Sequence, residues 1–469
     1  MIDTSAVRNK VLTLAFQGKL TTYNLSDDNV VGLYSQICKQ RDELIRRKEI
    51  KKNKTKAIQD TDIVYELPAN WMWVRLGEVI NLQSGQDLPT VDYNDVNKGI
   101  PYLTGASNFT IDGGLIINRW TEKPSAYAIN GDILLSVKGT VGRLAILHEN
   151  KVHIARQIMG IRPIGLNRDF VKYFIQAKIE ELKSISKGLI PGIERDNVLN
   201  MLMPMPPIEV QKRIVSKVDD IYGLLDTIDI FQTQYSTNVE ILRSKLIDAG
   251  IRGKLTEQLP EDGDAEALYN QIQDERVKHI KEGKIKKEKT LPEITEDEVL
   301  FKIPKNWKWV RMSEIIDVRD GTHDSPQYYE SGIPMITSKN LSDGRLDFEN
   351  TKFVSEEDAK KINERSFVDD GDILFAMIGT IGNPVLVKKE REFVVKNVAL
   401  FKNIDQHSLS MRYVYWYLMR EQYEFKKIVS GGLQPFISLK QFRMHVMPLP
   451  PFAEQVRIAT KLELLLSQI

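Results

Sequence analysis

Two pairs of polar residues at matching places of the sequence carry side chains that can recognise DNA bases. Arg156 and Gln157 in the first half of the chain correspond to Lys396 and Asn397 in the second half. Arginine can pair bidentately with guanine, and asparagine or glutamine with adenine, in the major groove. Because the chemistry differs between the two places, we predict that these residues contact bases. The alternative is that they are ordinary polar residues at the end of a strand.

Loops that combine glycine with polar residues provide further candidates, because base contact needs side chains that reach the groove while others hold phosphates. The candidates are Ser84, Gln86, Lys138, Thr140, Arg143 and Lys187 in the first half, and Thr322, His323, Lys339, Thr380 and Gln434 in the second. The turn Gly139–Gly142 returns with the same glycines and threonine at Gly379–Gly382. A residue that distinguishes bases should differ between the copies, so we expect this turn to shape a loop or to touch phosphate.

Motifs for catalysis are missing from the sequence. Gly250, Gly253 and Lys254 lack the spacing and the following hydroxyl residue of a phosphate-binding loop, and we expect these glycines to end a helix. The histidines and the single cysteine, Cys38, show no metal-ligand spacing. We therefore expect no catalytic residue, no metal and no cofactor in this chain, and any catalytic groups would lie on another polypeptide.

Composition limits the class of protein. With 65 lysines and arginines against 64 acidic residues, only a local patch can indicate a polyanionic partner. One cysteine excludes an internal disulfide framework and suits a reducing compartment. The sequence has no signal segment and no apolar run of about 18 residues. We therefore expect a soluble, cytoplasmic protein.

The candidate residues lie within a sequence that occurs twice. Trp71 and Trp73 match Trp307 and Trp309, and their place at the entry to each copy favours core packing over stacking on bases. The repeated segments are Leu67–Glu78 and Ile303–Glu314, Gly131–Gly142 and Gly371–Gly382, and Met203–Ile214 and Met447–Ile458. A duplicated domain is suited to bind two similar things.

Each copy has the pattern of an α+β domain. Short apolar runs after Gly131 and Gly371 predict buried strands. Helical patterns follow at Arg168–Ser184 and Met411–Lys427.

A long helix is predicted between the copies, with its start after Pro206 and Pro207 and its end at Gly250 to Gly253. Apolar residues recur there at alternating steps of four and three, which is typical of a coiled coil, with Gln232 as a polar interruption. The predicted seam is Ile214, Val218, Ile221, Leu225, Ile228, Gln232, Tyr235, Val239, Leu242, Leu246 and Ala249.

The two ends of the chain match the two parts of this helix. Ile458–Ile469 corresponds to Ile214–Leu225, and Val7–Thr21 corresponds to Leu242–Thr256. We therefore predict that the terminal segments together form a second spacer, which pairs with the central helix as an antiparallel coiled coil.

The predicted fold is α+β, with two similar domains separated by the helix pair in a pseudo-twofold, circular repeat. The basic runs Arg46–Lys56 and Lys278–Lys289 are interpreted as solvated helix ends or linkers, with phosphate contact or docking to a partner subunit as the alternative. The predicted parts are a helical segment and basic linker at 1–66, the first domain at 67–206, the central spacer at 207–256, a basic linker at 257–302, the second domain at 303–450 and the C-terminal spacer helix at 451–469.

The order and duplication of these segments resemble the specificity subunit of type I restriction-modification systems. The resemblance rests on the Pro-x-Asn-Trp-x-Trp-Val-Arg and Met-Pro-x-Pro-Pro segments, the helical spacers and the Gly-Lys-Leu-Thr sequences at 18–21 and 253–256. It implies that each domain is a target-recognition domain for one half of a bipartite DNA site and that the helices set the gap.

The resemblance also implies partners. A subunit of this family has no activity of its own; it docks two methyltransferase subunits, which modify adenine with S-adenosylmethionine, and restriction subunits, which need ATP and magnesium. Two other hypotheses remain: a two-domain adaptor that binds proteins without DNA specificity, and a fused restriction-methylation enzyme, against which the missing catalytic motifs argue.

Overall fold

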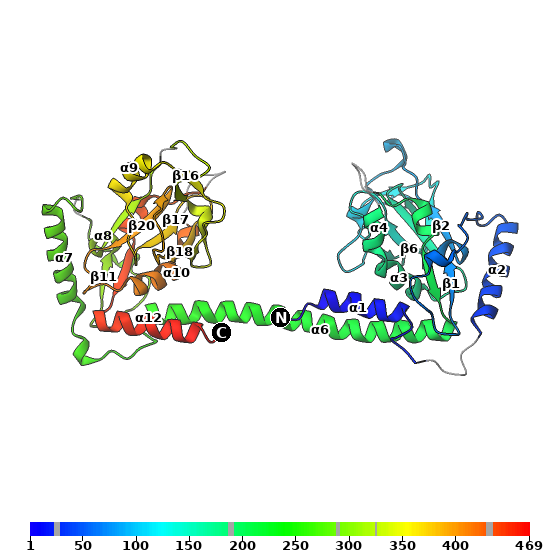
Figure 1. Ribbon diagram of the computed structural model, residues 1–469, viewed down its shortest axis with the longest axis horizontal. Coiled ribbons are helices and arrows are strands. Elements are labelled where there is room, and N and C mark those ends of the chain that lie inside the picture. The colour runs from blue at the N-terminus through cyan, green and yellow to red at the C-terminus, as the bar shows by residue number, and fades with distance from the viewer. Residues whose placement is uncertain (23–28, 186–191, 288–290, 324–325, 428–434) are drawn as a thin grey trace. The chain divides into compact units, whose positions relative to one another are not determined.

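The chain forms two compact units, Met1–Thr233 and Gln234–Ile469, here called unit 1 and unit 2 (Figure 1). The computed structural model describes residues 1–22, 29–185, 192–287, 291–323, 326–427 and 435–469. Lys187 and Gln434, two of the predicted contact residues, lie outside the described residues. The boundary between the units falls within helix α6 (Ile208–Ile251), so each unit includes one part of that helix.

Unit 1 is built on two β-sheets. The first is antiparallel, in the order β2 (Ile80–Ser84), β9 (Ile158–Pro163), β6 (Ile133–Ser136) and β7 (Leu144–Ile146). The second has the order β4 (Trp120–Thr121), β3 (Ile100–Leu103), β8 (Lys151–Ile154) and β5 (Tyr127–Ile129), with β3 and β8 parallel. The entry and exit of the domain pair as β1 (Met72–Arg75) and β10 (Leu202–Met205).

The helices of unit 1 contribute buried residues to one core, which they share with the first sheet and the first part of α6. They are α1 (Thr4–Phe16), α2 (Val30–Arg46), α3 (Arg168–Ala177), α4 (Ile179–Ile185) and α5 (Arg195–Leu199). Helix α1 runs antiparallel to α6: Thr4 Oγ1 donates to Asp229 at 2.6 Å, and Arg8 pairs with Asp226 at 2.8 Å. Phe16 packs on Phe170 of α3, with ring centroids 5.3 Å apart. The predicted helix at Arg168–Ser184 is therefore present, but it is divided at Lys178.

Unit 2 repeats this plan with additions. Its main antiparallel sheet has the order β12 (Ile316–Asp320), β20 (Val398–Asn403), β17 (Ile373–Ala376) and β18 (Gly382–Leu386). The remaining strands are β13 (Ile333–Ile336), β16 (Lys352–Val354) and β19 (Val394–Val395) in a second sheet, the pair β14 (Leu341–Ser342) and β15 (Arg345–Leu346), and the pair β11 (Lys308–Arg311) and β21 (Val446–Leu449). Its helices are α7 (Ala265–Lys281), α8 (Met312–Ile315), α9 (Glu356–Ser366), α10 (Met411–Lys427), α11 (Leu439–Met444) and α12 (Phe452–Leu466).

The apolar runs after Gly131 and Gly371 are central strands that are buried on both faces. In β6, Ile133 and Leu135 belong to the main core of unit 1, whereas Leu134 belongs to the smaller core between the sheets. In β17, Phe375 belongs to the main core of unit 2, whereas Leu374 belongs to a smaller core. Because successive side chains of a strand point to opposite faces, a continuous apolar sequence requires cover on both sides. The predicted strands are confirmed.

The repeated Trp-x-Trp-Val-Arg segments are structural. Trp71 and Trp307 are buried, and Trp309 packs edge-on against Phe301 at 5.0 Å. Arg311 is almost fully buried and donates to both carboxylate oxygens of Glu298 at 2.9 Å. The predicted core role of these segments is confirmed.

The predicted seam of α6 is only partly buried. Ile214, Val218 and Leu225 are buried in unit 1, but in unit 2 Tyr235 is 62% exposed and Leu242 is 43% exposed. The prediction is wrong at these two residues, because the buried positions of this part of α6 include Ile247, Gly250 and Ile251. A Cβ on Gly250 would lie 3.1 Å from Leu462 of α12, so the missing side chain brings the helices together on that face. Along this contact α12 runs antiparallel to α6.

No helix among the described residues is long and apolar enough to cross a membrane.

Candidate nucleic-acid interface

In unit 1 the loop after β2 lies against the turn between β8 and β9. Gly85 N donates to Ile158 O at 3.1 Å, and Gln86 N donates to Ile154 O at 2.9 Å. A Cβ on Gly85 would lie 2.0 Å from the carbonyl oxygen of Ala155, so this approach requires glycine. The structure thereby brings together four of the predicted residues, Ser84, Gln86, Arg156 and Gln157.

Asp87 joins the two loops through Arg156. Arg156 Nε lies 2.7 Å from Asp87 Oδ2, and the backbone N of Arg156 donates to Asp87 Oδ1 at 3.1 Å. The Arg156 side chain is 68% exposed, and an exposed ion pair contributes only about 0–1 kcal/mol. The contact orients the guanidinium weakly enough for another acceptor to replace Asp87. Sequence reasoning missed Asp87, although it directly follows the predicted Gln86.

The turn between β6 and β7 lies beside these two loops. Val137 N donates to Gln157 O at 2.8 Å, and Ser136 Oγ donates to Thr140 O at 2.8 Å. Lys138 and Thr140 are exposed, whereas Arg143 donates to Phe109 O at 2.6 Å. Part of the Arg143 guanidinium thus supports the fold. We call residues 84–87, 137–143 and 156–157 the unit 1 rim.

A half-buried arginine and a buried histidine support the unit 1 rim from beneath. Arg195 donates to Ser84 Oγ at 3.3 Å, and burial lowers the pKa of its guanidinium. His153 Nε2 lies 2.8 Å from Gln86 O, and burial lowers the pKa of this imidazole too. A carbonyl oxygen only accepts, so Nε2 carries the proton. Nδ1 can then accept from the backbone N of Ala126 at 3.3 Å, which fits the neutral ring.

Unit 2 has the matching loops with different side chains. Gly321 N donates to Val398 O at 3.0 Å, as Gly85 does in unit 1. His323, the counterpart of Asp87, has its Nδ1 3.0 Å from Asn397 Oδ1, so it contacts the counterpart of Gln157 rather than that of Arg156. Asn397 has φ 55°, a left-handed conformation that asparagine tolerates. The structure groups four of the predicted residues here, Thr322, His323, Lys396 and Asn397.

The remaining predicted residues of unit 2 lie near this group or on the next turn. Ser338 Oγ donates to Asn397 O at 3.2 Å, which places the exposed Lys339 beside it. Thr380 is exposed on the turn between β17 and β18. We call residues 320–323, 338–340 and 396–397 the unit 2 rim.

The glycines of the repeated turns have backbone conformations that fit the predicted role of shaping a loop. Gly139 and Gly142 have φ of 74° and 92°, and Gly379 and Gly382 have φ of 75° and 115°. These values favour glycine over any residue with a side chain.

Asp320 and Arg365 extend the unit 2 rim. His323 Nε2 lies 2.7 Å from Asp320 Oδ2, and Arg365 pairs with the other oxygen of the same carboxylate. Arg365 lies on α9, for which the described part of unit 1 has no counterpart between β4 and β6. Sequence reasoning missed Arg365, and the usable signal was that residues 356–366 interrupt the repeat.

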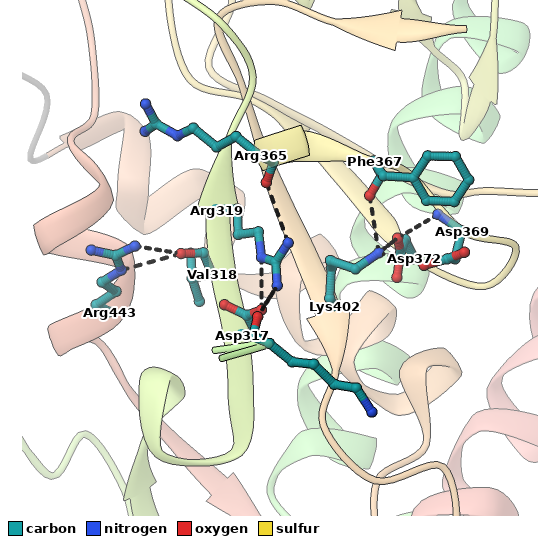
Figure 2. Close-up of polar contacts among 10 residues, drawn as sticks. Asp317, Val318, Arg319, Arg365, Phe367, Asp369, Asp372, Lys402 and Arg443 are labelled. Atoms are coloured by element: carbon teal, nitrogen blue, oxygen red, sulfur yellow. Dashed lines mark hydrogen bonds and ion pairs between the residues drawn. The ribbon is translucent and has the colours of Figure 1, made fainter. Parts of the chain in front are cut away.

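Hydrogen bonds and ion pairs hold the strands that lie beneath the unit 2 rim (Figure 2). We call these supporting strands and their polar contacts the frame of the unit. Arg443 donates to Val318 O at 2.7 Å, as Arg195 of unit 1 donates to Leu82 O at 2.7 Å. Lys402 bridges Asp369 at 2.8 Å and Asp372 at 2.5 Å. Burial raises the pKa of Asp372, and Lys402 opposes this shift through its charge and its hydrogen bond.

The basic runs lie at helix ends. Helix α2 ends at Arg46 and α7 ends at Lys281, so each basic run begins at or near the end of a helix. Residues 288–290 of the second run lie outside the described residues. Where the chain is described, no group of three or more His, Cys, Asp or Glu residues is arranged to hold a metal ion.

Comparisons with known proteins agree on one family. The model of the type I restriction modification DNA specificity domain matches residues 68–233 and 304–469. The chain is 24% identical to the type I restriction enzyme EcoAI specificity subunit of Escherichia coli, over 97% of this chain and 88% of that protein. It is 22% identical to the MjaVIII specificity subunit of Methanocaldococcus jannaschii, over 85% and 86% of the two chains.

Solved structures show the same fold. A chain from a study of assembly and conformational transition in a type I restriction-modification system matches with a TM-score of 0.61 and 20% identity, over 86% of this chain and 92% of that one. The HsdS subunit from Thermoanaerobacter tengcongensis matches with a TM-score of 0.50 and 20% identity, over 86% and 91%.

Proposed function

The chain belongs to the type I restriction modification DNA specificity family, and we propose that each of its two units recognises one half of a bipartite DNA site. The observation that carries this proposal is the match between the two rims. Both units present corresponding loops, but Asp87 pairs with Arg156 in unit 1, whereas in unit 2 its counterpart His323 contacts Asn397, the counterpart of Gln157. Shared backbone geometry suits similar placement on DNA, and different side chains suit different bases.

The chain is then a specificity subunit without catalysis of its own. Methylation of adenine with S-adenosylmethionine would be the task of two methyltransferase subunits, and ATP- and magnesium-dependent cleavage that of restriction subunits. The relatives named as specificity subunits support this division of labour.

Helix α6 offers apolar surface for such partners. In its unit 1 part, Leu224 and Phe231 are more than half exposed, and in its unit 2 part Tyr235 is too. Exposed apolar and aromatic side chains on one helix are typical of protein interfaces. We therefore assign docking of the methyltransferase subunits to α6, and Phe231→Glu should reduce their co-purification with this chain while Lys212→Glu should not.

The decisive experiment expresses the full chain with its cognate methyltransferase subunit and maps N6-methyladenine across the genome. The proposal expects one bipartite motif with a fixed gap. An absent motif or a gapless one would contradict it and would favour a protein-binding adaptor.

Domain exchange supplies the matched control. Replacing residues 68–206 with the corresponding domain of another family member should change one half of the motif only. Replacing residues 304–450 should change the other half. Deleting seven residues within 214–249 should change the gap or abolish methylation, because we assign the gap to the helices.

A further inference from the structure

Asp320 is a buried carboxylate that holds two outward side chains at once. It ends β12, and its side chain is only 6% exposed. One carboxylate oxygen contacts His323 Nε2 at 2.7 Å, and the other pairs with Arg365. A carboxylate only accepts, so both partners donate to it. The corresponding residue of unit 1 is Ser84, which is neutral, so this arrangement is particular to unit 2.

His323 continues the network to Asn397. Its Nδ1 lies 3.0 Å from Asn397 Oδ1, so both ring nitrogens are occupied. The backbone of Asn397 is held as well, because its N donates to Thr322 O at 3.2 Å and its O accepts from Ser338 Oγ at 3.2 Å. His323 therefore serves as a bridge, and Asn397 is the side chain whose amide the bridge orients.

Arg365 lies at the other end of the network. Its carbonyl oxygen accepts from Arg319 at 3.3 Å, and Figure 2 shows its side chain directed away from Arg319. The guanidinium carries five N–H donors, and the side chain stays 60% exposed although Asp320 holds one NH2 group. Together with Lys361 and His323, Arg365 lines a hollow of about 510 Å³ beside α9. An anchored, exposed arginine is suited to the two acceptors of a guanine edge.

We propose that Arg365 and Asn397 are specificity-determining residues of unit 2, which contact a guanine and an adenine of its half-site, and that Asp320 and His323 are the positioning residues that hold them. This inference rests on the proposed function. The network fixes side chains before DNA arrives, so less conformational freedom is lost on binding.

The test maps N6-methyladenine for the full chain expressed with its methyltransferase subunit. Arg365→Ala should lower discrimination at one guanine position of one half-site by about 10- to 100-fold, the usual range for a bidentate pair. Arg365→Lys should do the same, since lysine keeps the charge but loses the fork. Asn397→Ala should relax an adenine position of the same half-site. Lys360→Ala, which removes an exposed charge from α9 away from the hollow, should change nothing.

The positioning residues have their own signature. Asp320→Asn should relax the guanine and the adenine positions together, whereas His323→Ala should relax the adenine position alone. Adding Asp320→Asn to Arg365→Ala should cause no further loss at the guanine position, because Asp320 acts there through Arg365. The same variants of the purified full chain, selected on DNA of randomised sequence, give a second readout in which the half-site of unit 1 is the internal standard.

The possible outcomes distinguish this inference from the proposed function on which it rests. If the unaltered chain directs no bipartite motif, both proposals fall. If it does, but Arg365→Ala and Arg365→Lys leave the motif intact, only the present inference is overturned. It is also overturned if Arg365→Lys abolishes the whole half-site while Lys360→Ala does not, because that result marks a structural role.

Discussion

Unit 1 and unit 2 share a frame but differ along the rim. In unit 1 Asp87 pairs with Arg156, whereas in unit 2 His323, the counterpart of Asp87, contacts Asn397, the counterpart of Gln157. In unit 2, Asp320 and Arg365 of α9 lie behind this contact, and the described residues of unit 1 have no such pair there. The rims thus differ in charge, in hydrogen-bonding groups and in the number of elements that support them.

The frames beneath the rims use the same interactions. Arg162 pairs with Asp132 at 2.7 Å where Lys402 pairs with Asp372, and Arg195 supports β2 as Arg443 supports β12. A frame interaction that is the same in both units fixes backbone geometry. A rim interaction that differs is therefore the better candidate for sequence specificity. If the frames are equivalent, matching substitutions in the two units should have matching effects.

The largest effect is expected at the buried arginine of the repeated tryptophan segment. Arg311 pairs with Glu298 and donates to Met444 O at 2.7 Å, and Arg75 donates to Asn200 O at 2.8 Å in the same way. Arg311→Ala should lower the free energy of unfolding by about 3–5 kcal/mol, because it empties the space of a fully buried side chain and removes its hydrogen bonds to Glu298 and to backbone carbonyls. Hydrogen exchange should then show lost protection at β11 and β21 only, and Arg75→Ala should show it at β1 and β10 only. Equal loss in both units after either change would break the comparison.

A smaller effect is expected at the repeated turns. Gly139 and Gly379 have positive φ, and a Cβ at either would meet nothing within 4 Å. Alanine should therefore cost only backbone strain, about 1 kcal/mol of unfolding free energy, and equally in both units. Urea denaturation measures it. A loss several times larger in one unit would show that this turn makes a contact that its counterpart lacks.

The smallest effect is expected in acid. The hydrogen bonds from Arg311 hold the pKa of Glu298 at about 2, below its ordinary 4.5. A lowered pKa in the folded state gives stability that is complete above pH 4.5 and is lost as the pH falls through 2. Glu298→Gln should flatten this part of the stability profile of unit 2. In unit 1, Asp62→Asn should do likewise, because a hydrogen bond from Gln59 N and then Arg75 lower the pKa of Asp62. Unchanged profiles would contradict the assignment.

Much of the frame could be predicted because its signals are local. A strand covered on both faces must be apolar throughout, so β6 and β17 are visible as unbroken runs. Helix α10 has the predicted bounds, and α6 begins after the two prolines and ends at the predicted glycines.

The seam of α6 shows that local sequence signals do not determine which face of a helix is buried. Its periodicity predicted burial at Tyr235 and Leu242, but the face of a helix that is covered depends on where its partner lies, and α12 packs against Gly250. A heptad pattern cannot contain that information.

The sequence by itself determined the duplication, the family, the α+β domains and most residues of the two rims. Only the tertiary structure decided which of these residues act together. Arg156 reaches Asp87 across 69 positions, and Arg365 reaches Asp320 across 45. Such pairs form because distant loops are carried to one edge by strand pairing, and the spacing of residues along a chain does not encode a distance in space.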